Sequence, residues 1–154
     1  MSAAKTVVSY LQSHRIPYAV VPHRHTLSSR ETADAAHVAA ECLAKAVVFW
    51  DRQGYLMAVV PGDRHVGVDR LSDKLGRQLA LADESWIASV FKDCELGAIP
   101  PLGPAYGMET IVDDSLVGLA EVYFEAGDHE ELICVDGEQF LRVLDQARHG
   151  QFSH

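Results

Sequence analysis

The chain has 154 residues, 48% of them hydrophobic and 23% charged, a balance typical of one globular domain that buries its core without metal or disulfide support. Its formal net charge of -9 argues against a protein that binds DNA or RNA over a broad surface, because phosphate contacts require concentrated Lys and Arg. We find neither a secretory signal nor the roughly 18 apolar residues of a membrane span, so we expect one cytoplasmic domain over residues 1–154, without membrane contact.

Helical and strand patterns alternate in the first half of the chain. Apolar residues at helical spacing predict a helix that ends before Pro17, and an alanine-rich segment predicts a second, N-capped helix. Two apolar runs separated by residues 51–54, a turn sequence, predict an antiparallel hairpin. The expected elements are a helix over 3–13, a strand over 18–21, a helix from Ser28 or Ser29 to Glu41, and strands over 43–50 and 55–60.

The second half of the chain begins with helices and continues mainly in strands. Two short helices each open with an acidic residue, which suits the positive end of the helix dipole. Residues 97–104 contain prolines that exclude a regular helix or a central strand, so a shaped loop is expected. The tail after Arg148 should be frayed. The expected elements are helices over 69–75 and 83–91, strands over 109–112, 119–124 and 131–135, and a helix over 137–147.

Helices that flank strands joined mainly by short turns predict a single α/β domain. We expect a mixed, mostly antiparallel sheet that curls towards a barrel and is surrounded by helices. The pattern leaves the strand order open.

Lys45 interrupts the apolar run of the expected strand over 43–50. Burying an ammonium without a partner is costly. Either the end of the side chain reaches a pocket, where it could bind or catalyse, or its aliphatic part carries the charge back to solvent. The pattern alone leaves both open.

Two loops could bring further groups to such a pocket. The Gly/Pro loop over 97–104 holds backbone N–H and carbonyl groups in fixed directions, which suits binding a carbonyl oxygen or a ribose edge; a purely structural turn is the alternative. Gly127, Asp128 and His129 stand between two expected strands, where loop residues converge on sites. An inert surface histidine is the alternative there.

Other chemistries have little support in the sequence. His23 and His25 lack a third ligand at metal spacing, so no metal site is expected. No GxSxG motif indicates a serine hydrolase, and no glycine pattern indicates a Walker or Rossmann phosphate site.

The charges are unevenly distributed along the chain. Residues 109–138 include ten acidic residues and no Lys or Arg. A polyanion should avoid that segment and approach the more basic one over 64–78, although a solvated helix face explains the same charges. The basic residues of that segment are Arg64, Arg70, Lys74 and Arg77.

Three of these features, in this order, resemble the YbaK and prolyl-tRNA synthetase-associated editing domain family. They are a lysine in an early strand, a Gly-x-x-Pro loop about fifty residues later, and a Gly-x-His element before the penultimate strand. The approach to the alanine-rich helix is also similar, and the likeness covers nearly the whole chain. It implies a barrel-like mixed sheet surrounded by helices, with a pocket for the aminoacylated terminal adenosine of tRNA.

The resemblance also implies a reaction and its residues. The reaction is hydrolysis of the ester between a wrongly attached amino acid and tRNA, without a metal or organic cofactor. Lys45 would hold the terminal phosphate or ribose and place the ester as the catalytic residue. The substrate-binding residues would be His23, Thr26, Ser28, Gly97, Ala98, Ile99, Pro100, Gly127, Asp128 and His129. The tRNA-binding residues would be the four basic ones named above.

Specificity is less defined. Ala46 and Asp128 depart from the residues common in the family, and both could alter which amino acid is accepted. The resemblance favours alanine on a proline tRNA, then cysteinyl-tRNA, with a tRNA synthetase as a further partner. Two alternatives remain open: a non-catalytic module that recruits a synthetase or a small ligand, and an unrelated hydrolase or lysine Schiff-base enzyme.

Overall fold

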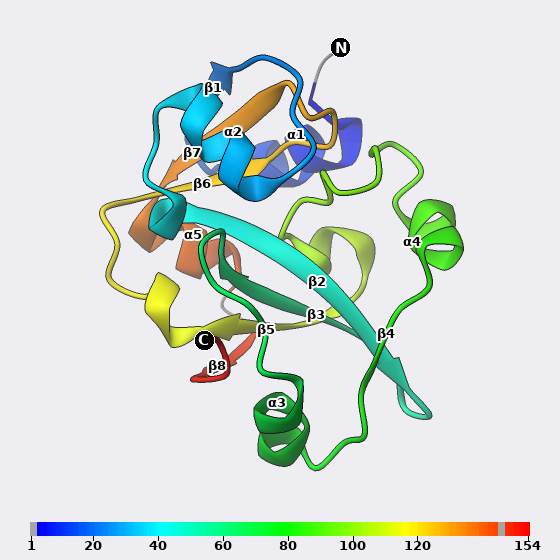
Figure 1. The fold of residues 1–154 in the computed structure, drawn as a ribbon. Coiled ribbons are helices and arrows are strands. Elements are labelled where there is room, and N and C mark those ends of the chain that lie inside the picture. Colours follow the sequence, from blue (N-terminus) through cyan, green and yellow to red (C-terminus); the bar gives the residue numbers. More distant parts are fainter. Residues whose placement is uncertain (1–2, 145–146) are drawn as a thin grey trace.

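Eight strands form one sheet in the computed structural model, which describes residues 3–144 and 147–154 (Figure 1). The strands are β1 (Ala19–Pro22), β2 (Leu43–Asp51), β3 (Gly54–Pro61), β4 (Ala80–Leu81), β5 (Glu109–Asp113), β6 (Glu121–Glu125), β7 (Glu131–Asp136) and β8 (Arg148–Gly150). Their order across the sheet is β1-β7-β6-β2-β3-β5-β8, and β4 pairs with β2.

The sheet is mixed. Strand β2 runs antiparallel to β3 and β4, and β7 runs antiparallel to β1 and β6. The pairs β2–β6, β3–β5 and β5–β8 are parallel. The expected hairpin is confirmed, since the Asp51 carboxylate accepts hydrogen bonds from the Gln53 and Gly54 N–H groups of its turn. The prediction of an α/β domain with a mixed, mostly antiparallel sheet is also confirmed.

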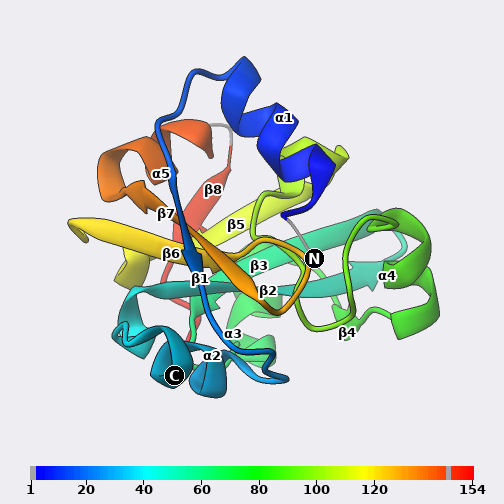
Figure 2. The same ribbon diagram turned by 90° about the horizontal axis from the view of Figure 1, so that it is seen from above.

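Helices cover both faces of the sheet. They are α1 (Lys5–Ser13), α2 (Ser29–Ala36), α3 (Val68–Leu75), α4 (Glu84–Val90) and α5 (Gly137–Val143). Figure 2 shows α1 and α5 on one side, and α2 and α3 on the other. The largest core cluster lies with α1 and α5, and two smaller clusters lie beneath α2 and α3. Among the described residues, none of the helices has the length and apolar character needed to cross a membrane.

Side chains of β2 alternate between the two faces of the sheet, and this alternation determines on which face Lys45 lies. Ala44 and Val48 belong to the large cluster, whereas Leu43 packs in the cluster with α2 and Phe49 in the cluster with α3. Because successive side chains of a strand point to opposite faces, Lys45 shares the face of Leu43 and Phe49. Lys45 therefore lies between the two small clusters, where β2 passes between α2 and α3 (Figure 1).

Two helix ends differ from the predictions. The helix expected to continue to Glu41 ends at Ala36, because His37 adopts a left-handed conformation with φ 58° and closes it. A 3₁₀ turn, Ala40–Cys42, follows. The last helix was expected to reach Ala147 and ends at Val143; residues 145 and 146 of that prediction lie outside the described residues.

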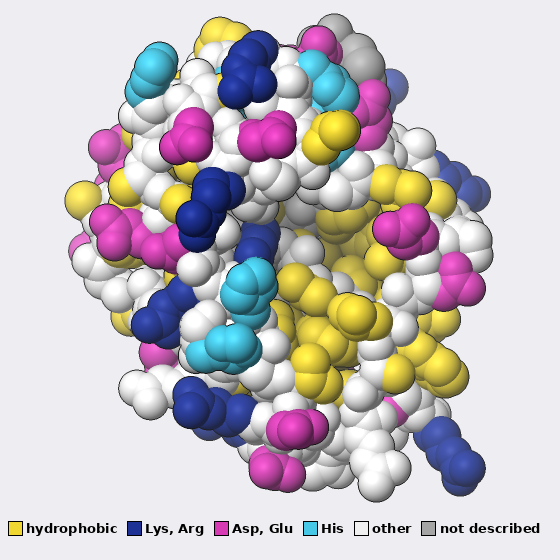
Figure 3. All heavy atoms as spheres, viewed as in Figure 1, with side chains coloured by type: hydrophobic (Ala, Val, Ile, Leu, Met, Phe, Trp, Pro, Cys, Tyr) yellow, Lys and Arg dark blue, Asp and Glu magenta, His cyan; other side chains and the backbone are white. Residues whose placement is uncertain are grey.

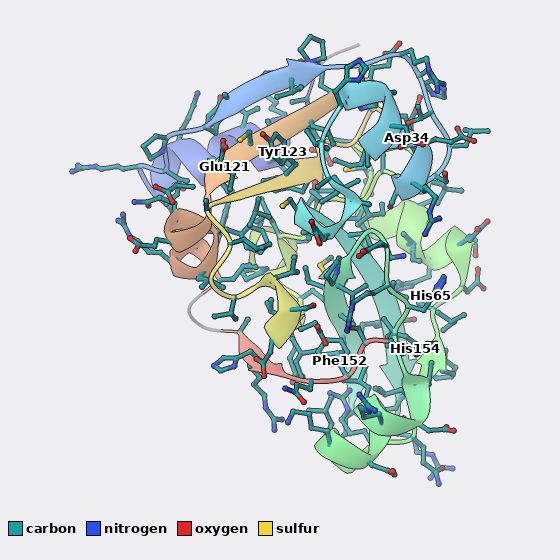
Figure 4. The ribbon with its side chains drawn as sticks, turned by 60° about the vertical axis from the view of Figure 1, so that its left-hand side comes forward. Asp34, His65, Glu121, Tyr123, Phe152 and His154 are labelled. Carbon is teal, nitrogen blue, oxygen red and sulfur yellow. The ribbon has the colours of Figure 1, made fainter. Side chains whose placement is uncertain are left out.

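The tail after Arg148 is ordered, so the prediction of a frayed end is wrong. Strand β8 pairs with β5, and the Phe152 side chain is fully buried. The backbone N–H groups of Phe152 and Ser153 donate to Asp113 Oδ1 at 3.0 Å. His65 and His154 exchange two backbone hydrogen bonds, and Figure 4 shows their side chains next to each other. These contacts offset the entropy lost on ordering the tail.

Candidate active site

A cleft of about 380 Å³ lies over the middle of β2, within the range of roughly 300–1,000 Å³ typical of ligand pockets. Figure 3 shows it as a hollow where hydrophobic side chains gather, with Lys, Arg and His side chains along one side. The lining comes from the start of α2, from β2, β4 and α4, from the loop before Pro100 and from the end of β6. The lining residues are Ser29, Leu43, Ala44, Lys45, Ala46, Val47, Val48, Leu81, Ala82, Glu84, Ile87, Leu96, Gly97, Ile99 and Glu125.

Lys45 is the cation of this cleft, and it also lines a second hollow of about 280 Å³ beside it. Arg30, Asp63 and His65 contribute to that more polar hollow. Burial lowers the pKa of the Lys45 ammonium, Asp63 raises it part of the way back, and Arg30 lowers it again. The ammonium therefore stands at the junction of an apolar cleft and a polar hollow, as expected for a group that reaches a site.

The loop before Pro100 is fixed by the histidine of the Gly-Asp-His element. His129 is 4% exposed and its Nε2 lies 2.6 Å from the carbonyl oxygen of Leu96, so Nε2 carries a hydrogen and donates. Gly97 has φ 83°, and a Cβ there would stand 3.2 Å from the His129 ring. The hydrogen bond between His129 and Leu96, 33 positions apart, thus joins the histidine and the glycine loop into one unit at the edge of the cleft.

The neighbours of His129 build the turn that presents it. Gly127 has φ 104°, and a Cβ there would approach Ala4 and Cys94 to 3.0 Å. Asp128 is 1% exposed, and its Oδ1 accepts from the N–H groups of Glu130 and Glu131 at 3.0 Å. Neither Gly127 nor Asp128 lines the cleft, so both shape the loop in this structure instead of facing a substrate.

Within the Gly-x-x-Pro segment, only part of the chain faces the cleft. Gly97 and Ile99 line it, whereas Ala98 and Pro100 are buried outside it. The Ala98 N–H donates to the Glu95 carbonyl oxygen at 3.1 Å and closes a turn. The residues of this loop that line the cleft are therefore Leu96, Gly97 and Ile99, and of these Leu96 already uses its carbonyl oxygen to accept from His129.

The residues before α2 hold that helix against the sheet. Ser28 caps α2 by accepting from the Glu31 N–H at 3.2 Å, and it also lines the polar hollow. Thr26 is 1% exposed, and its Oγ1 lies 2.5 Å from Thr32 Oγ1. The His23 side chain is fully buried, with Nε2 3.7 Å from Glu125 Oε1. The Thr26 and His23 side chains are thus buried next to the site, and neither lines the cleft.

The basic segment is only partly available to a partner. The Arg77 side chain is 6% exposed, donates twice to the Asp51 carboxylate at 2.8 and 2.7 Å, and reaches Glu109 at 3.2 Å. Its hydrogen bond, together with those of the turn, lowers the pKa of Asp51 to about 2. Arg77 therefore ties α3 to the sheet, which corrects the expectation that it contacts tRNA. Arg64, Arg70 and Lys74 are exposed.

Glu125 is the residue that the sequence analysis missed. It lines the cleft from the end of β6 and is 7% exposed. In the sequence it is one of ten acidic residues over 109–138, and nothing in that run distinguishes it. The one local signal that could have found it is its place two residues before Gly127 of the Gly-Asp-His loop.

Replacing His129 by asparagine should loosen the loop while preserving the turn. Asparagine tolerates the left-handed conformation that His129 adopts at φ 60°, but it is too short to hydrogen-bond to Leu96. We expect a loss of about 1–3 kcal/mol in unfolding free energy and faster amide hydrogen exchange at 96–99. The control is His25→Asn, which changes a half-exposed ring 5.4 Å from His129. Equal protection of the loop in both variants would contradict the role of His129.

Comparisons with known proteins bear on the family and the fold of the chain. The sequence profile of the aminoacyl-tRNA editing domain matches residues 23–143. The proline–tRNA ligase of Fervidobacterium nodosum is 31% identical over 93 residues, which are 60% of this chain and 16% of the ligase. The chain therefore corresponds to a small part of that enzyme.

Two solved structures share the fold over the whole chain. The hypothetical protein APE2540 has a TM-score of 0.85 at 18% identity and covers 97% of this chain and 100% of its own. A proposed trans-editing enzyme for prolyl-tRNA synthetase has a TM-score of 0.83 at 20% identity, covering 100% and 98%. The fold that the resemblance implies is confirmed. Because the family profile covers most of its length, this chain belongs to the aminoacyl-tRNA editing domain family.

Proposed function

We propose that the protein is an aminoacyl-tRNA deacylase that acts in trans, with Lys45 as its principal catalytic residue. The observation that carries the proposal is the position of the Lys45 ammonium between an apolar cleft and a polar hollow in a member of the editing family. The terminal nucleotide would occupy the polar hollow, its ribose would lie at Lys45, and the amino acid would enter the cleft. Action on tRNA would place the protein in the cytoplasm.

The chemistry demands little of the side chains. Water adds to the ester carbonyl carbon, the bond to the ribose oxygen breaks, and the products are the free amino acid and a ribose hydroxyl that takes up a proton. An aminoacyl ester is already activated, so fixed backbone groups of 97 and 99 and the substrate's own hydroxyl would suffice to orient the water. Lys45 would fix the phosphate or ribose and so place the ester beside that loop.

The lining of the cleft supports an apolar amino-acid side chain as the substrate group. Besides Lys45 and the acidic groups, its lining is mostly aliphatic, with Ala44, Ala46 and Ala82 among the contributors. We propose alanine on a proline tRNA as the first candidate and cysteine as the second. Ala46 faces the cleft and can affect this choice directly, whereas Asp128 can act only through the loop that it shapes.

The acceptor stem would pass the exposed cations beside the cleft. These are Arg64, Arg70 and Lys74, with Arg30 next to Lys45. Such a short basic edge on an acidic protein predicts weak, salt-sensitive binding of the acceptor end only. A tRNA synthetase is the proposed source of the mischarged substrate.

A panel of mischarged tRNAs tests the function. We expect the protein, at low salt, to release one small amino acid, alanine before cysteine, serine or proline, at a rate far above spontaneous hydrolysis. Acid-gel separation of charged and uncharged tRNA measures this directly. Higher salt should slow the reaction, since it weakens the phosphate contacts. If no ester is hydrolysed while tRNA still binds, the chain is a binding module of the same fold.

A further inference from the structure

Three charged residues line the cleft: the cation Lys45, the exposed acid Glu84 at the start of α4, and the buried acid Glu125. The parallel register of β2 and β6 pairs Leu43 with Tyr123 and Ala44 with Phe124, so Lys45 and Glu125 are the next residues on each strand. They lie on the same face of the sheet and both line the cleft. No ion pair joins them within the described residues, and the acid that acts on the Lys45 ammonium is Asp63. The cleft therefore presents a cation and, separately from it, one buried acid, Glu125.

The acid is poorly satisfied within the protein. Glu125 is 7% exposed, and neither carboxyl oxygen has a hydrogen-bond partner of normal geometry among the described residues. His23 Nε2 lies 3.7 Å away from Oε1. Burial raises the pKa of Glu125, while Thr32, His23 and His129 lower it part of the way and Asp128 raises it again. Such a carboxyl group would gain from a cation brought into the cleft.

The proposed substrate supplies one cation there. The terminal adenosine and its phosphates carry none, whereas the amino acid attached to the ribose has an α-ammonium. We propose that Glu125 determines specificity for the charged aminoacyl group: its buried carboxylate attracts the α-ammonium, while Lys45 holds the opposite, anionic end. The inference rests on the proposed deacylase function and goes beyond it by naming the group that reads the amino-acid end.

The competing explanation is structural. If Glu125 served to hold His23 in a stabilising ion pair, its replacement by glutamine would lower stability. Our proposal predicts the opposite change: replacement of Glu125 by glutamine should raise stability. A carboxyl group whose pKa is raised on folding opposes folding once ionised; the opposition is absent below the ordinary glutamate pKa of about 4.3 and complete above the raised value.

Glu125→Gln should therefore melt at a higher temperature than the parent at pH 7.5. The difference should close as the pH falls towards about 4, because the parent carboxyl group becomes protonated and no longer opposes folding. Thermal unfolding across this pH range measures it. A lower melting temperature of the variant at pH 7.5 would support the structural explanation and overturn ours.

The activity test compares alanyl-tRNA with lactyl-tRNA, which nitrous acid makes from it by replacing the ammonium with a hydroxyl group. Each rate is divided by that of spontaneous hydrolysis. We expect the parent to favour the alanyl ester by on the order of ten-fold, as estimated for a charge pair across a partly screened cleft. Glu125→Gln should lose most of this preference by slowing alanyl hydrolysis alone.

Glu121→Gln is the matched control. Glu121 lies on the same strand (Figure 4), is exposed and does not line the cleft, so its replacement should leave the preference unchanged. A parent without preference between the two esters overturns the inference with no variant needed, and so does an unchanged preference in Glu125→Gln. Failure of the parent to hydrolyse either ester would instead contradict the proposed function.

Discussion

Replacement of Lys45 by methionine is expected to slow deacylation by roughly 10²–10³-fold, the loss typical of removing one preorganised charged or hydrogen-bonding group from an active site. Methionine keeps most of the aliphatic chain that β2 places between the two small core clusters, and removes only the ammonium. The ester would then no longer be held beside the loop that ends at Pro100. Single-turnover deacylation of alanyl-tRNA, with the protein in excess, measures the change.

The same variant should fold as well as the parent or better. The pKa of Lys45 is lowered by folding, so the charged ammonium opposes folding at any pH below that lowered value, and the opposition fades as the pH rises towards the ordinary lysine pKa. Lys45→Arg is the control that retains charge; it should keep part of the activity, since its planar fork fits a different geometry. Full activity in Lys45→Met, with unchanged melting, would contradict the catalytic role.

Lys45 and Glu125 have the same physical character. Burial lowers the pKa of Lys45 and raises that of Glu125, so in both cases it favours the neutral form. The charged form of each group therefore lowers the stability of the folded protein. Structural charges in this protein behave differently: Asp51 has its pKa lowered to about 2 by Arg77 and its turn, so its ionised form stabilises the fold. A ligand of opposite charge that binds in the cleft would offset this loss of stability, which is the physical argument for a role of both groups in binding.

The sequence predicted one of these two groups and missed the other for a definite reason. Lys45 can be found from the sequence because it interrupts the apolar pattern of a strand, and that pattern lies within a few neighbouring residues. Glu125 gains its importance from the parallel pairing of β6 with β2, which joins residues about 80 positions apart. No local pattern contains that pairing. For Arg77 the sequence shows the charge but not its partners, because Asp51 and Glu109 are remote in the sequence. The prediction therefore gave it a partner outside the protein.

Local signals were sufficient for most elements. The hairpin turn, the cap of α2 by Ser28 and the proline-rich loop follow from residue types alone. The end of the chain did not follow, because its polar residues indicate fraying. The buried Phe152 side chain and two backbone hydrogen bonds to Asp113 hold the end of the chain in place instead. These contacts depend on where β5 lies in the folded sheet, which no local pattern predicts.

Phe152→Ala is accordingly expected to cost about 3–5 kcal/mol of unfolding free energy, the range for truncating a buried phenylalanine. The ring is fully buried in the cluster formed by β2, β3, β5 and α3, together with Phe49, Leu56 and Leu71. Its loss would leave a cavity on the face of β2 that carries Lys45, and would release the tail from Asp113. Urea unfolding followed by circular dichroism measures the change.

The neighbouring substitution Gln151→Ala separates packing from a general effect of the tail, because Gln151 is exposed and should change stability by less than about 0.5 kcal/mol. Release of the tail should also loosen the backbone pairing of His65 with His154, and His65 lines the polar hollow beside Lys45. We therefore expect Phe152→Ala, under conditions where it remains folded, to weaken tRNA binding as well. Stability and binding equal to those of Gln151→Ala would mean that the tail is not part of the core, and the hollow would then have to be held by α2 and β3 alone.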